Sequence, residues 1–129
     1  KEDLTADSIE AVIADLKRNG YLDDEQFAKM WAENRVVNRP RGRRAVSQEL
    51  SRRGVSRDTI ENVLDSYYPD DADLVRKVAV RRAEIMRGLD KATFRRRLSG
   101  YLTRRGFGFG VVAPLLDELW EDPPDQESD

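Results

Sequence analysis

The 129-residue sequence contains neither cysteine nor histidine. Without cysteine, the chain can form no disulfide and no thiolate metal site, which fits a reducing compartment, and we expect a cytoplasmic protein. Without histidine, it lacks the commonest general base and the commonest zinc ligand. It also has no apolar run long enough to cross a bilayer and no signal-peptide pattern. We therefore predict no membrane partner, no catalytic residue, no metal and no cofactor.

Three similar six-residue stretches are typical of helix ends. They read LKRNGY at Leu16–Tyr21, LSRRGV at Leu50–Val55 and LTRRGF at Leu102–Phe107. Each provides a Leu for the last turn, basic residues beside the negative end of the helix dipole, a Gly for a left-handed stop and an apolar residue that folds back. The stretch at Leu16 falls outside the register of the other two. We interpret it as a similar helix stop and not as a repeat equivalent.

The two stretches in register belong to a longer repeat. Residues 55–64 match residues 4–13 at an offset of 51, and a third copy begins 52 residues after Val55. Each copy has apolar residues at i, i+3, i+4 and i+7, which is the spacing of one helix face. A period near 51 residues has room for three helices, and no strand pattern is present, so we predict an all-α fold of tandem three-helix repeats. The apolar stripes are Ile9, Val12, Ile13 and Leu16; Ile60, Val63, Leu64 and Tyr67; and Val112, Leu115, Leu116 and Leu119.

This period predicts four parts. Residues 1–40 form an incomplete first repeat without its first helix, residues 41–88 a second repeat, and residues 89–122 a third repeat with two visible helices. Residues 123–129 form an acidic disordered tail. The chain does not begin with Met and opens on the second helix of a repeat, so we expect it to be N-terminally truncated. The expected helices span about 7–19, 43–53, 57–68, 71–87, 91–105 and 110–121, with one more that Asp23 or Asp24 caps.

Several residues suit helix caps or the helical core. Thr5 or Asp7 is expected to cap the first helix with Glu10 completing a capping box, and Ser56 to cap a later one. Asp23 and Asp24 favour a cap over a metal or acid/base site, because carboxylates stabilise the positive end of the helix dipole. Pro114 is expected in the opening turn of the last helix. We predict that Phe27, Met30, Trp31 and Asn34 share one helix face, that Leu74, Val75, Val78, Ala79, Arg82 and Ile85 share another, and that Trp31 and Trp120 pack in the core and are not stacking platforms.

The net charge of −2 hides a strongly polarised sequence. Residues 1–34 carry a net charge of −5, residues 35–105 carry +10 and residues 106–129 carry −7. The basic segment is rich in arginine, whose planar fork binds carboxylates and phosphates with two hydrogen bonds. It could instead be a solvated face paired with Glu49, Asp58 and Asp90, but so few acids are interleaved that we favour a binding surface for an anionic partner. Nucleic acid and an acidic protein groove both remain open as partners.

Four motifs in order resemble the RecX family of recombinase regulators. They are GYLDDEQFA at Gly20–Ala28, PRG at Pro40–Gly42, LSRRGV at Leu50–Val55 and the stretch Leu98–Phe107 that ends in LTRRGF. The resemblance implies an elongated, curved, monomeric array of three-helix repeats that binds the groove of the RecA–DNA filament. It also implies that the protein inhibits ATP hydrolysis, strand exchange and filament growth in recombination, repair and SOS control, without catalysis of its own.

From charge and resemblance together, we expect arginines on the first helices of the second and third repeats to contact the RecA filament or its DNA. A general DNA-binding helical module is the alternative function, and a purely structural helical adaptor is a third. The expected partner-binding residues are Arg39, Arg41, Arg43, Arg44, Arg52, Arg53, Arg96, Arg97, Arg104 and Arg105. The expected structural motif residues are Gly20, Asp23, Asp24, Phe27, Gly42, Leu50, Gly54, Leu102 and Gly106.

Overall fold

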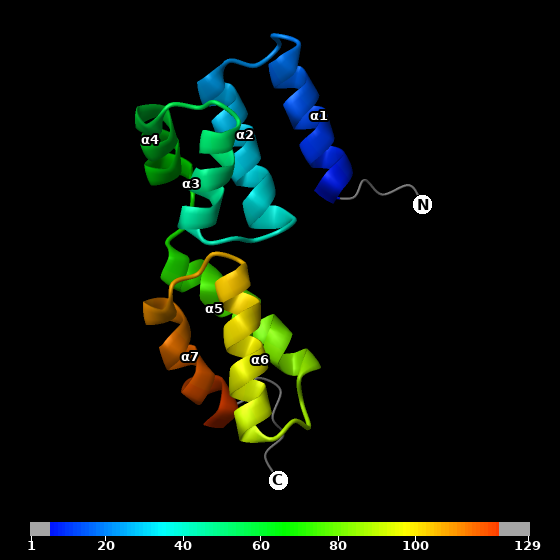
Figure 1. Cartoon of the computed structure of the whole chain (residues 1–129), viewed down its shortest axis with the longest axis vertical. Coiled ribbons are helices and arrows are strands. Elements are labelled where there is room, and N and C mark those ends of the chain that lie inside the picture. The colour runs from blue at the N-terminus through cyan, green and yellow to red at the C-terminus, as the bar shows by residue number, and fades with distance from the viewer. Residues whose placement is uncertain (1–5, 122–129) are drawn as a thin grey trace. The chain divides into compact units, whose positions relative to one another are not determined.

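The structure is a computed structural model that describes residues 6–121 (Figure 1). This part of the chain contains helices and no strand, which confirms the all-α prediction. The helices are α1 (Ala6–Arg18), α2 (Asp24–Val37), α3 (Arg43–Arg52), α4 (Arg57–Tyr67), α5 (Asp71–Ile85), α6 (Lys91–Arg104) and α7 (Phe109–Glu121). Thr5 and the acidic tail at residues 123–129 lie outside the described residues.

The helices pack into two compact units, Lys1–Pro69 and Asp70–Asp129. The boundary between these compact units lies after Pro69, whereas the sequence period places repeat boundaries after residues 40 and 88. The second unit groups α5 with α6 and α7. A sequence period predicts the length of a repeat but not the helix at which the repeat begins, and packing decides that point.

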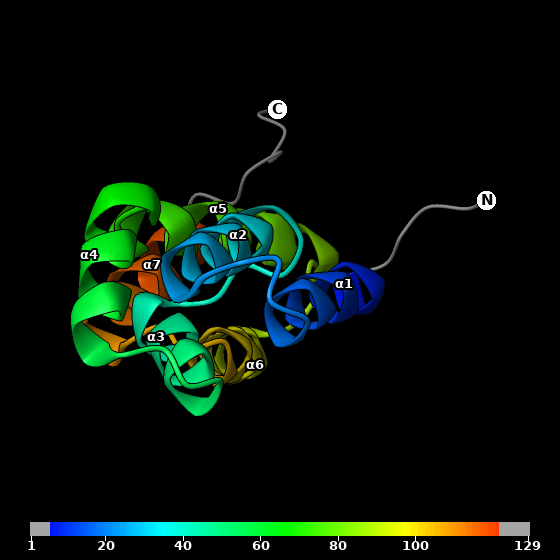
Figure 2. The same cartoon turned by 90° about the horizontal axis from the view of Figure 1, so that it is seen from above.

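In the first unit, α2 lies between α1 and α4 (Figures 1 and 2). Its helix buries Phe27 and Trp31, whose ring centroids are 5.5 Å apart. Val46 and Leu50 of α3 and Leu64 of α4 are also fully buried in this unit.

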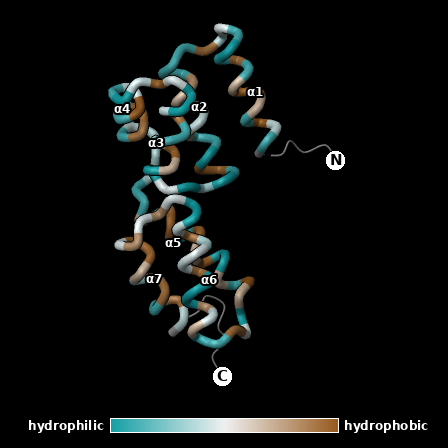
Figure 3. The backbone as a smooth tube through the Cα atoms, viewed as in Figure 1, coloured by the Kyte–Doolittle hydropathy of each residue, from teal (hydrophilic) through white to brown (hydrophobic). Residues whose placement is uncertain are grey.

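In the second unit, α7 packs against both α5 and α6. More hydrophilic positions occur along α6 than along α7 (Figure 3). Phe94, Leu98 and Leu102 are the buried residues of α6, and the ring of Phe94 lies 5.3 Å from that of Trp120 on α7. The core prediction is confirmed for Trp31, which is fully buried, whereas Trp120 is only half-buried.

Asp23 caps α2 through a complete capping box. Its carboxylate accepts a hydrogen bond from the Gln26 backbone N at 2.8 Å, and the Gln26 side chain accepts one from the Asp23 backbone N at 2.9 Å. Asp24 lies in the first turn and pairs with Lys17. The capping role of Asp23 is thus confirmed, as is that of Ser56, which accepts from the Thr59 backbone N.

The capping box predicted for the first helix is wrong. Asp7 lies within α1, in its first turn, and Glu10 points to other elements of the first unit. Both acids form ion pairs with arginines that follow α2 or belong to it, and those partners lie far away in sequence. A local pattern could not show that these pairs prevail over the cap.

The three predicted helix stops share one backbone arrangement. The glycine has a positive φ in each, at +90° for Gly54 and +89° for Gly106, and the next residue donates a backbone hydrogen bond to the Leu five positions earlier. Val55 and Phe107 are buried after the fold-back, but Tyr21 is 74% exposed. The stretch at Leu16 is therefore a stop of the same backbone type without the packing of the other two.

Some predicted apolar positions face solvent. Val12, Met30, Tyr67 and Ile85 are all exposed, because each of these helices has only part of its circumference covered by neighbours. Pro114 lies inside α7, in its second turn and not its first. The missing N–H there would have bonded to the carbonyl of the exposed Gly110, which water can reach.

Candidate partner interface

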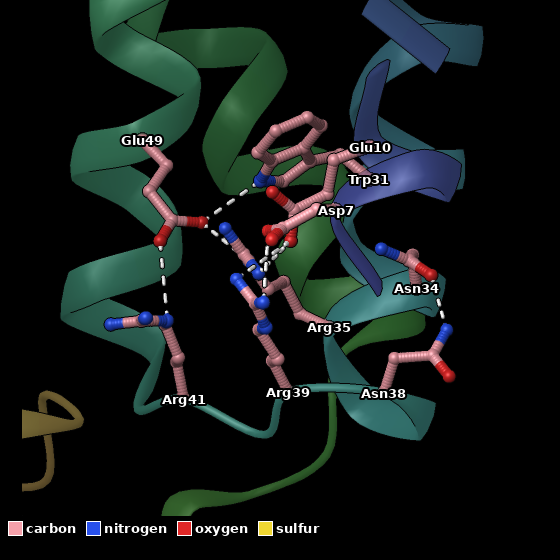
Figure 4. Close-up of polar contacts among 9 residues, drawn as sticks. All are labelled: Asp7, Glu10, Trp31, Asn34, Arg35, Asn38, Arg39, Arg41 and Glu49. Atoms are coloured by element: carbon pink, nitrogen blue, oxygen red, sulfur yellow. Dashed lines mark hydrogen bonds and ion pairs between the residues drawn. The ribbon is translucent and has the colours of Figure 1, made fainter. Parts of the chain in front are cut away.

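Arg35 forms a buried ion cluster in the first unit (Figure 4). Its side chain is 6% exposed and binds the carboxylates of Glu10 on α1 and Glu49 on α3. Glu49 Oε1 accepts hydrogen bonds from Arg35 Nε at 2.8 Å and from Trp31 Nε1 at 2.9 Å. This set, called the Arg35 cluster below, joins α1, α2 and α3 and belongs to the framework of the unit.

Three of the predicted partner-binding arginines extend or flank this cluster. Arg39 pairs with Asp7 at 2.8 Å, and Arg41 lies 3.5 Å from Glu49 (Figure 4). Arg43 pairs with Asp65 of α4 at 2.8 Å. Much of the positive charge between residues 35 and 43 is therefore compensated within the unit.

Two others stack on aromatic rings of their own unit. The guanidinium of Arg53 lies 4.5 Å from the centroid of the Trp31 ring, and that of Arg105 lies 4.4 Å from the Tyr101 ring. Each is the second arginine of an RRG stretch, so the two stops place equivalent residues over aromatic rings. Such contacts favour the charged side chain and fix its position.

The remaining five predicted arginines are exposed and form no ion pair with any acid of residues 7–120. Two of them lie on α3 and three on α6. They are Arg44, Arg52, Arg96, Arg97 and Arg104.

The arginines of α6 line a pocket of about 500 Å³ in the second unit. Its wall contains five arginines and no acid of the described chain. We call it the arginine pocket; its lining is Arg82, Ile85, Met86, Arg87, Leu89, Arg96, Arg97, Gly100, Tyr101 and Arg104. It places side chains of α5, of the following turn and of α6 around one concave surface.

The ring of Tyr101 contacts arginine side chains of the second unit. The guanidinium of Arg82 lies 4.3 Å from its ring centroid, close to the distance for Arg105. The buried Nε of Arg82 has no hydrogen-bond partner in the described chain. Gly100 leaves room for Arg104, whose Nη1 lies 2.9 Å from the position that a Cβ of residue 100 would occupy.

Acids of α7 pair with other arginines of the second unit, outside this pocket. Glu118 accepts a hydrogen bond from Arg76 Nη1 at 3.2 Å, and Asp117 pairs with Arg95. The hydrogen bond from Arg76 lowers the pKa of Glu118 below its ordinary value, and the same contact raises the pKa of Arg76. These acids pair away from the arginine pocket, whose described lining contains no acid.

Sequence reasoning did not identify the roles of Arg35, Arg82, Arg87 and Tyr101. One signal was present for Arg82, because its position falls on the apolar side of the helix pattern at 71–87, where an unpaired charge is costly. No signal in the sequence distinguished Arg35 from the exposed arginines, since its burial results from α1 and α3 packing on α2.

Two further observations limit the chemistry of the described residues. The side chains of residues 7–120 include no group of three acids that could bind a metal ion, and the described lining of the arginine pocket contains no pair of a nucleophile and a base. Among the same residues, no helix has the length and hydrophobicity needed to span a bilayer.

Comparison with known proteins gives one consistent family. Residues 23–64, which contain α2, α3 and α4, match the family model described as "RecX, second three-helix domain". The protein called "Regulatory protein RecX" from Thermobifida fusca is 34% identical over 94% of this chain and 66% of its own length. The proteins of that name from Chlorobium limicola and Streptomyces coelicolor are each 31% identical, over 75% and 68% of their own lengths. No solved structure matches the chain.

Proposed function

Because the chain belongs to the RecX family of regulatory proteins, we propose that it is a non-enzymatic regulator of the RecA–DNA filament. In this proposal it binds the filament groove as a cytoplasmic monomer. There it inhibits the RecA ATPase, strand exchange and filament growth during recombination, repair and the SOS response.

The observation that carries this proposal is the set of uncompensated arginines on α3 and α6. The exposed guanidinium groups of these helices suit acidic protein surfaces and phosphates. Arg44 and Arg52 of α3 are the contacts that we assign to RecA itself. Arg39, Arg41 and Arg43 act mainly by holding the first unit together, since each pairs with an acid of that unit.

Binding of this kind requires no catalytic group. A regulator that contacts neighbouring RecA protomers would restrict the motions and the access to DNA that strand exchange needs. The two units of the chain each present arginines, which supplies the two attachment points that such bridging requires.

The test is the DNA-dependent ATPase of RecA, titrated with this chain and with the double variant Arg44→Glu and Arg52→Glu. We expect the variant to inhibit at least about tenfold more weakly, because each reversal replaces an attraction with a repulsion. The matched control, Arg18→Glu with Arg57→Glu, makes the same charge change at exposed sites of α1 and α4. Equal inhibition by the two variants would exclude Arg44 and Arg52, and no inhibition by the unaltered chain would overturn the proposal.

The alternative, a general DNA-binding module, is favoured by one observation, the acid-free lining of the arginine pocket. It predicts tight binding to naked DNA that falls steeply with salt, together with no inhibition of RecA at concentrations too low to coat the DNA.

A further inference from the structure

We propose that the arginine pocket binds one unpaired nucleotide of a single-stranded nucleic acid. Its guanidinium groups bind the phosphate, and its apolar side chains and an arginine plane contact the base. This goes beyond the proposed function, because it requires no RecA and assigns a ligand to a site in the second unit alone.

Charge identifies the phosphate part of the ligand. Arg96, Arg97 and Arg104 line the pocket from α6, all three are exposed, and the described lining contains no carboxylate. Guanidinium forks bind phosphate oxygens with two parallel hydrogen bonds, and a nucleic-acid strand presents a charge at every nucleotide. A strand passing over the pocket would therefore find several donors at each phosphate.

The apolar part of the wall identifies the base. Ile85 is 69% exposed at the end of α5, and Met86 and Leu89 continue the lining beside it. Unpaired bases pack on apolar and aromatic side chains and on guanidinium planes, whereas bases in a duplex are already stacked. An apolar wall beside arginines thus favours single strands over duplex DNA.

The pocket also has the size and order of a binding site. About 500 Å³ lies within the range of roughly 300–1,000 Å³ for small-molecule sites, so it admits a nucleotide but not a double helix. Arg82 is held against Tyr101 and has a buried Nε donor without a partner in the described chain. The contact with Tyr101 fixes the guanidinium of Arg82 in the lining, and the exposed donors that an anion can reach are those of Arg96, Arg97 and Arg104.

An acidic peptide is the other occupant that charge alone would allow. Its carboxylates are carried by flexible side chains. Unlike a nucleotide, it has no planar ring beside each charge that could pack on Ile85 and on the guanidinium of Arg82. The observations therefore favour a nucleotide, and peptide binding becomes an outcome of the test.

The experiment measures fluorescence anisotropy of a labelled short oligothymidylate with the whole chain and no RecA. Its competitors are an unlabelled duplex, an abasic strand with the same phosphates, and polyglutamate. We expect the chain to bind the labelled oligothymidylate. The abasic strand, the duplex and polyglutamate should each displace it only weakly. In Arg96→Glu with Arg104→Glu, affinity should fall at least about tenfold, as expected when charged hydrogen bonds are lost. Arg18→Glu with Arg57→Glu should bind as the unaltered chain does.

Ile85→Ser separates the base contact from the charge. The side chain is exposed, so the variant is expected to fold, and it should bind the oligothymidylate more weakly and the abasic strand unchanged. Equal competition by duplex or abasic strand would overturn the assignment of an unpaired base. Competition by polyglutamate as strong as by oligothymidylate would assign the pocket to acidic peptides. Failure to bind the strand at all would overturn the proposal while the ATPase test of the proposed function still stands.

Discussion

The two units differ in where their acids lie relative to a cluster of arginines. In the first, Arg35, Arg39, Arg41 and Arg43 each pair with a carboxylate, and Arg35 is buried in doing so. In the second, arginines line a pocket whose described wall contains no acid, while the acids of α7 pair with Arg76 and Arg95. Sequence composition makes the two segments look alike, and only the distribution of acids in the fold distinguishes them.

The position of the acids separates arginines that stabilise their own unit from exposed arginines that can bind an anionic partner. Compensated charges stabilise the unit that contains them and leave little attraction for a ligand. Clustered like charges repel one another and gain from an anion that neutralises them. The shared RRG stops show this division at single residues: Arg53 and Arg105 stack on rings of their own unit, whereas Arg52 and Arg104 are exposed.

The largest expected effect tests the compensated side of this comparison. Glu49→Ala should lower the free energy of unfolding by about 3 kcal/mol, because it leaves Arg35 partly uncompensated in a buried site and removes the acceptor of Trp31 Nε1. Asp65→Ala breaks the exposed pair with Arg43 and should cost less than about 1 kcal/mol. Urea unfolding followed by circular dichroism measures both. Equal costs would show that the Arg35 cluster is no more structural than a surface pair.

The next largest effect concerns the glycine helix stop that occurs in both units. Gly54→Ala and Gly106→Ala should each lower the free energy of unfolding by about 1–2 kcal/mol, because both positions have a φ near +90°. At Gly54 no atom lies within 4 Å of the added Cβ, so the cost there comes from the backbone and not from a clash. Similar losses in thermal or urea unfolding would support equal stops in both units. A negligible loss at either site would contradict the prediction for that stop.

Gly100→Ala should raise the free energy of unfolding, by less than the glycine substitutions at the helix stops lower it. Residue 100 lies inside α6, where alanine is favoured over glycine by about 0.5–1 kcal/mol. The added Cβ would meet the flexible end of Arg104 and displace it from its present position. We expect a chain that is slightly more stable in urea and binds oligothymidylate more weakly. Unchanged strand affinity would indicate that the position of Arg104 is unimportant.

A smaller difference in the free energy of unfolding is expected between variants of one arginine from each unit. Arg39→Gln should lower the free energy of unfolding by a few tenths of a kcal/mol, because it loses Asp7. Arg97→Gln should not lower it, and at low salt it should raise it slightly, because it relieves repulsion in the arginine pocket. Urea unfolding at low and high salt checks the contrast. A loss of stability in Arg97→Gln would mean that this arginine has a structural partner.

The sequence predicted the helices, the helix stops and the caps at Asp23 and Ser56 because these are local features. Gly54, Gly106, Asp23 and Ser56 act within a few residues of their own positions, so their patterns carry the relevant physics. The boundary at Pro69 could not be predicted in this way, because it depends on which faces of α4 and α5 are covered.

The sequence predicted which residue type forms the candidate site, but it did not predict where in the fold these residues gather. An excess of arginine favoured an anionic partner, yet the sequence could not show which arginines have acids beside them. Glu10 lies 25 residues from Arg35 in sequence, and Glu118 lies 42 from Arg76. Such pairs arise from packing, and they removed several predicted contacts from the free surface.

The smallest expected effect is the pH dependence of the second unit. Hydrogen bonds from the Thr93 side chain and backbone lower the pKa of Asp90, the cap of α6, and the contact with Arg76 lowers the pKa of Glu118. The unfolded chain then binds protons at a higher pH than the folded one, so stability is lost as pH falls from the ordinary carboxyl pKa values towards the lowered ones. Both groups are exposed, so the loss should be gentle. Asp90→Asn, which keeps a capping oxygen, and Glu118→Gln should each flatten the acid slope of unfolding free energy against pH. An unchanged slope in both variants would show that these acids do not link α6 and α7 to pH, and that acids elsewhere govern the acid limb.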